Sequence, residues 1–227
     1  MKLSFIFTAI FAFLLTFPAT SAHASSYDEM LSAVKLGDVS GVRHWLERGM
    51  DVDTIDREGN TLLMLAVREK RPQLVTIFIQ ARARLNLRNM HGDTALKIAA
   101  YQGHLGMVRE LVEAGAEIDT EGWAPLIYAA FNGHDEIVAF LLQQGARIDA
   151  RSESGMTALM AAARGGFLPI VRRLIAAGAE VNLRDANNET ALDWANKTKN
   201  TDITTALEAA GGLSGKKQPR KREPKAG

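Results

Sequence analysis

The side chains most able to do chemistry in this sequence are its five histidines, because the chain contains no cysteine. Without cysteine there can be no disulfide, thiolate metal ligand or cysteine nucleophile. His44 and His91 are isolated, while His104 and His134 each follow a glycine in similar segments. No Ser-His-Asp set, paired-carboxylate motif or glycine-rich phosphate loop is recognisable. We therefore expect structural histidines, no metal, no cofactor and no enzyme.

The bulk composition is that of a folded protein. The 227 residues are 47% hydrophobic and 23% charged, a balance that does not suit a disordered chain. The net charge is +1, so the whole molecule offers no electrostatic argument for binding nucleic acid. We expect a monomer whose partner is not a nucleic acid.

The N-terminus has the pattern of an export signal. A lysine at position 2 precedes an apolar run from Phe5 to Phe17, and Ala22-His23-Ala24 follows the small-x-small rule for cleavage. The pattern predicts a cleavable signal peptide over residues 1–24, cut near Ala24, and a periplasmic or secreted protein. An uncleaved anchor is the alternative, but the run is shorter than the roughly 20 residues that span a bilayer.

Internal repetition is the strongest signal in the chain. Glycines or their substitutes recur every 33 residues, with one step of 30, at positions 49, 82, 115, 145, 178 and 211. Two further series keep the same register, one from Gly59 to Asn188 and one from Gly37 to Lys199. A fixed period of this length predicts a stack of small supersecondary units.

Each unit reads as a turn followed by two short antiparallel helices. In the third unit, Thr94 is placed to cap an alanine-rich first helix, which Gly103 ends. The second helix carries an apolar stripe at 107, 108, 111 and 112, and Gly115 ends it in the left-handed conformation. A single unit cannot bury enough apolar surface to fold alone, so the units must stack.

The motif of these units resembles the ankyrin repeat. The matching pattern stands here as Gly92-Asp93-Thr94-Ala95-Leu96, Gly103-His104 and Gly115-Ala116-Glu117-Ile118-Asp119, and similar segments begin at Gly155 and Gly178. The resemblance implies an all-α solenoid of stacked antiparallel helix pairs with β-hairpin-like loops. We expect about six repeats over residues 25–212, including atypical terminal caps.

Departures from the family pattern predict local weaknesses. The histidine that usually follows Thr-Pro-Leu in the family is replaced in every unit, so the hydrogen bonds that it makes between loops are expected to be missing. The replacements are Met64, Lys97, Ile127, Met160 and Asp193. Arg82 stands where a helix-ending glycine is expected, and a side chain in left-handed geometry costs roughly 1–2 kcal/mol. The second unit should be the weakest.

The resemblance also implies where a partner protein binds. Partners of the family dock on the concave face, formed by hairpin tips and by exposed positions near the end of the first helix of each unit. The corresponding residues here are Arg68, Met90, His91, Tyr101, Gln102, Trp123, Phe131, Asn132, Met156 and Arg164.

Three aromatic residues of this set fall on two adjacent units. Because packed helices lie roughly 8–10 Å apart, Tyr101, Trp123 and Phe131 can form one continuous patch. Aromatic anchors rimmed by arginine are typical of interface hot spots. The alternative is that these rings fold inward onto their own scaffold. The 30-residue step shortens the hairpin before Trp123, which predicts a notch beside the patch or a tolerated loop deletion.

The C-terminal segment differs in kind from the repeats. Residues 213–227 are expected to be a disordered tail with one acidic residue, Glu223, and six basic residues: Lys216, Lys217, Arg220, Lys221, Arg222 and Lys225. Two functions remain open. One is a non-catalytic module of the bacterial cell envelope that binds, and protects or assembles, another protein. The other is a tether in which the tail binds anionic lipid or cell-wall polymer.

Overall fold

The computed structural model describes residues 19–215, with side chains from residue 26 onward. These residues form six antiparallel pairs of α-helices without a β-strand, apart from one isolated bridge between Ile55 and Thr61. The bounds are α1 Ala19–Leu36, α2 Val39–Glu47, α3 Leu62–Arg68, α4 Pro72–Gln80, α5 Ala95–Gln102, α6 Leu105–Glu113, α7 Pro125–Phe131, α8 Asp135–Gln143, α9 Ala158–Gly165, α10 Leu168–Ala176, α11 Ala191–Lys197 and α12 Thr201–Ala209.

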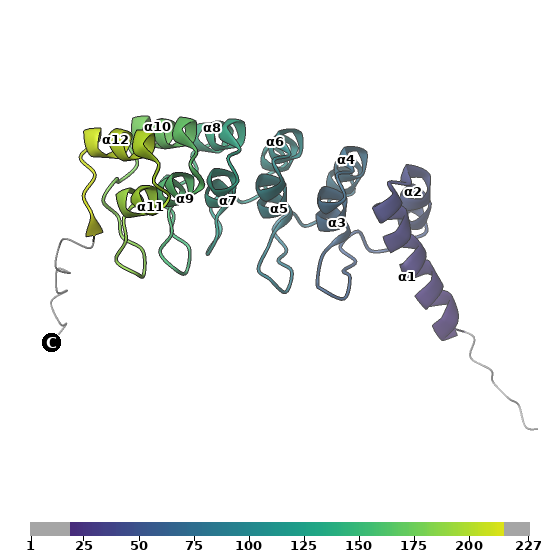
Figure 1. The fold of residues 1–227 in the computed structure, drawn as a ribbon. Coiled ribbons are helices and arrows are strands. Elements are labelled where there is room, and N and C mark those ends of the chain that lie inside the picture. Colours follow the sequence, from purple (N-terminus) through teal and green to yellow (C-terminus); the bar gives the residue numbers. More distant parts are fainter. Residues whose placement is uncertain (1–18, 216–227) are drawn as a thin grey trace, which may run out of the picture.

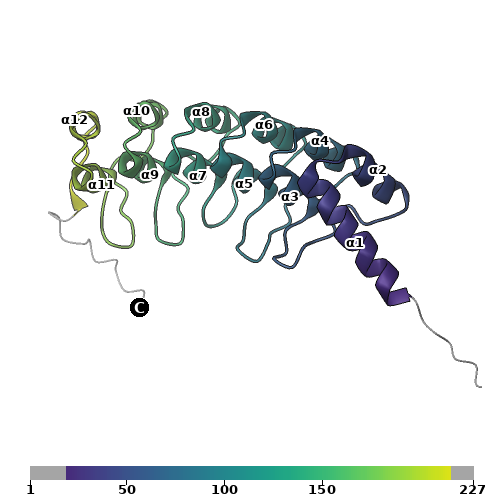
Figure 2. The same cartoon turned by 45° about the vertical axis from the view of Figure 1, so that its right-hand side comes forward.

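The pairs stack side by side into a curved, elongated array (Figure 1). Helices α3, α5, α7, α9 and α11 form an inner row, and long loops project from this row on the side away from α4, α6, α8, α10 and α12 (Figure 2). The predicted solenoid of about six repeats is confirmed.

The first helix of most units begins at a threonine cap. Thr61, Thr94, Thr157 and Thr190 each accept a hydrogen bond from the amide three residues later. In the fourth unit Ala124 makes no such bond, and Pro125 opens α7 instead. A proline suits the first helical position, because its ring fixes φ and its missing N–H has no partner there.

The core is one continuous strip between the two helix rows. The inner helices bury alanines such as Ala99, Ala129 and Ala162, which let neighbouring helices approach closely. The outer helices bury their branched stripe, with Val108 and Leu111 fully covered in α6. Each unit thus completes its core only against its neighbours, as expected for a solenoid.

Among residues 19–215, four residues other than glycine adopt positive φ, and each lies in one of the glycine series. Arg82 has φ 62°, as expected, and Lys70, Asn188 and Lys199 have φ 57°, 63° and 56°. The second unit therefore contains two of these positions. Left-handed geometry disfavours a Cβ, so these turns carry conformational strain that glycine would relieve.

A ladder of identical hydrogen bonds links successive units. An Asp or Asn in each linker accepts the backbone N–H of a residue one unit further on. The pairs are Asp53–Arg84 (2.8 Å), Asn86–Glu117 (2.9 Å), Asp119–Arg147 (2.9 Å), Asp149–Glu180 (3.1 Å) and Asn182–Leu213 (2.7 Å). The last pair shows that the residues after α12 begin a sixth linker of the same kind.

The predicted boundary of the tail at residue 213 is therefore three residues too early. Ser214 donates its hydroxyl to Asp193 at 2.6 Å, and the Gly215 amide donates to the same carboxylate at 2.7 Å. Burial acts to raise the pKa of Asp193, but these bonds, with two from the amide and hydroxyl of Thr190, hold it below its usual range. The basic residues from Lys216 onward lie outside the described residues.

At the other end, α1 begins at Ala19 and continues through the predicted cleavage site after Ala24. Most of the predicted signal peptide, residues 1–18, lies outside the described residues. Of the helices that the structure describes, none combines the length and apolar character needed to cross a membrane.

Candidate functional site

Two register positions repeat along the inner face of the array. The first lies near the end of each inner helix and is occupied, from the second unit to the sixth, by Arg68, Tyr101, Phe131, Arg164 and Lys197. The second lies just before each helix cap and is occupied by Asn60, Asp93, Trp123, Met156 and Glu189. Side chains at these two positions face one another within a unit, as the hydrogen bond between Arg68 and Asn60 shows.

The structure brings the three predicted aromatic residues together through a fourth. The ring of Tyr128 lies 5.6 Å from that of Tyr101 and 5.2 Å from that of Trp123, and Trp123 meets Phe131 edge-on at 5.5 Å. Aromatic rings prefer such offset and edge-to-face contacts at these distances. Trp123 and Phe131 pack partly against the core, whereas Tyr101 is 51% exposed. Two of the three predicted rings therefore fold partly inward, and Tyr101 stays open to solvent.

The aromatic row continues into the last two units. The guanidinium of Arg164 lies 5.6 Å from the Phe131 ring on one side and 5.0 Å from the Trp194 ring on the other. Lys197 lies 4.0 Å from the same tryptophan ring. Cations at these distances are attracted to the face of an aromatic ring. The inner face therefore carries a chain of rings and cations from α5 to α11.

Sequence reasoning missed Tyr128 and Trp194. Both belong to one register position of the inner helices, which also holds Leu65, Ile98 and Ala161. A search of that position for aromatic residues would have found them. The residues at this position in the other units are small or aliphatic, so the sequence pattern indicates a buried core position.

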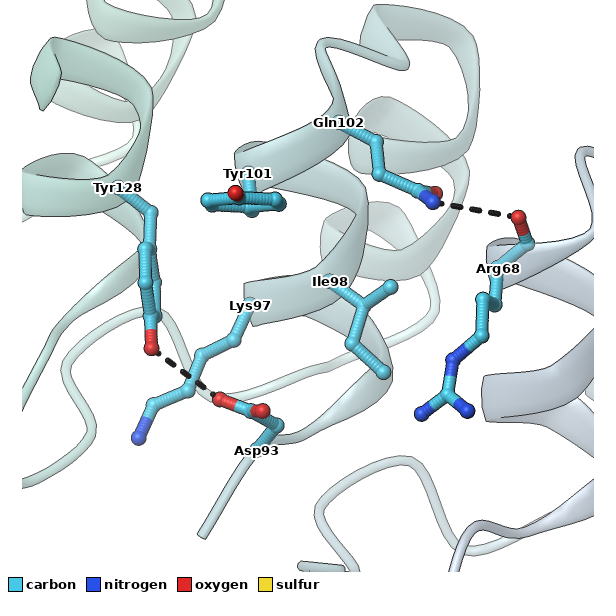
Figure 3. A pocket seen from close by; sticks show the side chains of 7 residues that line it. All are labelled: Arg68, Asp93, Lys97, Ile98, Tyr101, Gln102 and Tyr128. Atoms are coloured by element: carbon cyan, nitrogen blue, oxygen red, sulfur yellow. Dashed lines mark hydrogen bonds between the residues drawn. The ribbon is translucent and has the colours of Figure 1, made fainter. Parts of the chain in front are cut away.

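A cavity of about 280 Å³ opens on the inner face beside Tyr101 (Figure 3). It is lined by Arg68, Asp93, Lys97, Ile98, Tyr101, Gln102 and Tyr128.

Two hydrogen bonds hold the walls of this cavity (Figure 3). The Tyr128 hydroxyl donates to Asp93 at 3.3 Å, and the Gln102 amide donates to the Arg68 carbonyl at 3.2 Å. Burial, followed by the negative charge of Asp93, raises the pKa of Tyr128 to about 12. The phenol is therefore neutral, and a hydrogen-bond donor, throughout the physiological range.

Lys97 corrects the prediction that hydrogen bonds between loops are missing. Its side chain is only 4% exposed, and its ammonium donates to the carbonyls of Gly92 and Glu121, both at 3.0 Å. The lysine thus joins the loop of its own unit to the shortened hairpin of the next. Burial lowers the pKa of this ammonium from its ordinary value. Asp193 likewise ties Thr190 to Gly215 in the last unit.

The predicted site residues differ in accessibility. Met90, His91, Tyr101 and Arg164 are exposed, and the exposed fraction of Met90 is 77%. The half-buried members are Arg68, Gln102, Trp123, Phe131 and Asn132.

Met156 was wrongly placed in the site. It is only 5% exposed, because its apolar side chain packs into the core, and Asn60 and Glu189 at the same register position are buried as well. It therefore offers no surface to a partner.

The shortened hairpin of the fourth unit does border a notch. A cavity of about 640 Å³ lies between residues 120–122 and residues 147–151. Its two arginines already have partners within the protein: Arg147 forms an ion pair with Asp119 at 3.5 Å, and Arg151 donates to the Arg184 carbonyl. The buried hydroxyl of Thr120 has no hydrogen-bond partner among the described residues, but it is closed off from the surface.

The histidines of the Gly-His segments serve the packing of the units. The Nε2 atom of His134 lies 3.0 Å from the Tyr101 carbonyl, and its ring covers Gly103 so closely that a Cβ would collide with it. Burial of His104 lowers the pKa of its imidazole, and the charges of Lys70 and His134 add to the effect. Within residues 19–215, His, Asp and Glu nowhere gather into a group able to hold a metal ion.

Stacked helix pairs with projecting hairpins and an open inner face define a solenoid repeat protein. The chain belongs to the ankyrin repeat family, since the family model for ankyrin repeats in three copies matches residues 30–121, 84–152 and 126–212. Ankyrin repeats are protein–protein interaction modules, and the fold is generally non-catalytic.

Relatives cover only the repeats of longer proteins. The B-cell lymphoma 3 protein homolog of Mus musculus is 35% identical over 86 residues, which are 37% of this chain and 19% of that protein. The chain thus spans about a fifth of this curated relative.

Solved structures match nearly the whole solenoid. An ankyrin repeat domain from Acinetobacter baumannii is 30% identical, with a TM-score of 0.74 over 81% of this chain and 98% of that chain. A chain in the complex of a predatory endopeptidase from Bdellovibrio bacteriovorus with an immunity protein is 28% identical, with a TM-score of 0.72 over 80% of this chain and 97% of that one.

Proposed function

We propose that this protein is a non-catalytic binding module of the bacterial cell envelope that holds a partner protein on its inner face and protects or assembles it. The observation that carries the proposal is the row of rings and cations from Tyr101 to Lys197. Exposed aromatic clusters are uncommon on soluble proteins, and aromatic and arginine side chains dominate the energetics of interfaces.

The surroundings of this row support the same function. The hairpin bearing Met90 and His91 projects beside the aromatic cluster, and Met90 leaves most of its flexible, apolar side chain exposed. Such a side chain adapts well to a partner surface. The similar chain in the endopeptidase–immunity protein complex supports a protective role for a solenoid of this kind.

The envelope location rests on the N-terminal sequence. We infer that residues 1–24 direct export and are removed, so that the mature protein begins near Ser25. N-terminal sequencing of the protein purified from its natural host tests this inference. A start near Ser25 supports it, and retention of residues 1–24 contradicts it.

Binding on the inner face is tested by co-purification of the partner. The double variant Trp123→Ala with Phe131→Ala should lose the partner, but both rings are half-buried, so its melting temperature should fall as well. Tyr101→Ser with Met90→Ser changes exposed side chains and should lose the partner with unchanged circular dichroism and melting. Arg172→Ser, an exposed position on the outer helix α10, is the matched control. Full retention of the partner by the Tyr101 and Met90 variant rejects this site.

A second candidate function is favoured by the basic tail. Because Asp193 anchors Ser214 and Gly215, the six basic residues start from a fixed point on the last unit. They can attract anionic lipid or cell-wall polymer, with an affinity that falls as salt rises. A chain ending at Gly215 should then leave the envelope fraction at low salt. Unchanged partition rejects the tether.

A further inference from the structure

From the second unit to the sixth, the inner face carries three cations at one register position, and they differ in their hydrogen-bond and ion-pair partners. Arg68 donates to Asn60 at 2.7 Å and lies 3.5 Å from Glu58. Lys197 forms an ion pair with Glu189. Arg164, although exposed, has no hydrogen-bond or ion-pair partner among the described residues.

Arg164 lacks such a partner because of the residue at the register position just before the helix cap of its unit. That position supplies an acceptor to Arg68 through Asn60 and to Lys197 through Glu189, but in the fifth unit it is Met156. Methionine offers no oxygen, and its side chain is buried in the core. Because Met156 stands where the other two units carry an acceptor, the N–H donors of Arg164 have no acceptor at this position.

Arg164 is nevertheless held in place. The Phe131 and Trp194 rings lie on either side of its guanidinium, at 5.6 and 5.0 Å. Trp194 is itself fixed by the hydrogen bond from its indole N–H to Asp185 at 3.1 Å, and Phe131 is fixed by its contact with Trp123. Contacts with ring faces restrain a guanidinium without consuming its N–H donors, which lie in its plane.

We propose that Arg164 is the anchor for a carboxylate of the partner protein. A planar guanidinium presents paired N–H donors that match the two oxygens of a carboxylate. A single cation without an acidic partner matches the single negative charge of a carboxylate, whereas a phosphorylated side chain carries about −1.5 to −2. The inference rests on the proposed function and names the partner chemistry of its central position.

The test uses the ¹⁵N-labelled mature protein and follows the Nε–Hε signal of Arg164 in NMR spectra. The probe is the acetylated and amidated peptide Gly-Trp-Glu-Trp-Gly, and the matched peptide has Gln in place of Glu. A third peptide, with Gln and a free C-terminus, distinguishes a terminal carboxylate from a side-chain carboxylate. We expect the Glu peptide to shift the signal in a saturable way and the amidated Gln peptide to bind at least about tenfold more weakly.

Variants distinguish binding of a carboxylate by Arg164 from non-specific binding of the peptides. Met156→Glu restores the acceptor that Glu189 provides to Lys197, so it should occupy Arg164 internally and weaken binding of the Glu peptide about tenfold. Met156→Leu and Arg172→Gln, the latter on the outer helix α10, should leave this binding unchanged. Arg164→Gln, followed through the Trp194 indole N–H signal, should abolish the preference for Glu over Gln.

Three outcomes overturn the proposal: equal affinity for the amidated Glu and Gln peptides, undiminished binding by Met156→Glu, or no shift with any peptide. None of these outcomes tests the proposed function, which is tested separately by whether the Tyr101 and Met90 variant loses the partner protein. Conversely, the Glu peptide can bind selectively while the Tyr101 and Met90 variant retains the partner in full. That result rejects the proposed inner-face site and supports the role of Arg164 in binding a carboxylate.

Discussion

At the residue scale, the inner face depends on side chains whose partners come from neighbouring units. The Tyr128 hydroxyl donates to Asp93 of the preceding unit, and the Trp194 ring contacts the guanidinium of Arg164, which also belongs to the preceding unit. Register counting from the sequence predicted which positions face inward, because the period is nearly constant. It could not predict that Met156 is buried, since its packing into the core is a tertiary contact.

The ionisation of Tyr128 is a direct test of this packing. The chain has three tyrosines, and absorbance at 295 nm during an alkaline titration should show one of them ionising near pH 12. Because the folded state holds this proton more tightly than the unfolded state, the stability that it contributes is present below pH 10. That stability is lost as the pH rises from 10 through 12. Tyr128→Phe should remove the late step alone, and a wild-type curve that is complete by pH 11 contradicts the burial.

At the element scale, each helix pair repeats one design with local substitutions. Threonine caps, glycine turns and the apolar stripe made the helices predictable, because each signal acts within a few residues in sequence. The role of Lys97 was not predictable in this way. Its ammonium reaches Glu121 only because the shortened hairpin of the next unit bends over it, and that approach is a tertiary contact.

The left-handed turn at Arg82 gives a measurable cost at this scale. Arg82→Gly should raise the free energy of unfolding by about 1 kcal/mol, because glycine adopts positive φ without a clash between Cβ and the backbone. Urea unfolding followed by circular dichroism measures the change. Gly115→Ala is the reverse control, since a Cβ there meets no atom within 4 Å and only its φ of 96° opposes the side chain. It should be destabilising, and a gain in stability for this variant would refute the argument.

At the scale of the whole molecule, the solenoid is a set of units joined by one hydrogen-bond ladder and one continuous core. The sequence was sufficient to predict this architecture, since a period of 33 residues with repeated caps allows few alternatives. The contacts of residues 213–215 with the last units escaped prediction, because they are polar bonds to Asn182 and Asp193 rather than part of an apolar pattern. The partner itself cannot be read from the fold, because ankyrin arrays present the same face to unrelated proteins.

The central claim is that the inner face, not the outer one, holds another protein. The most direct measurement replaces Tyr101 with a photo-crosslinking amino acid in cells of the natural host, with the same replacement at Arg172 on the outer face as the comparison. Mass spectrometry should identify one dominant protein crosslinked at position 101, and the crosslink should disappear when Trp123→Ala and Phe131→Ala are added. Equal crosslinking of that protein from position 172, or no protein adduct at position 101, would contradict the account.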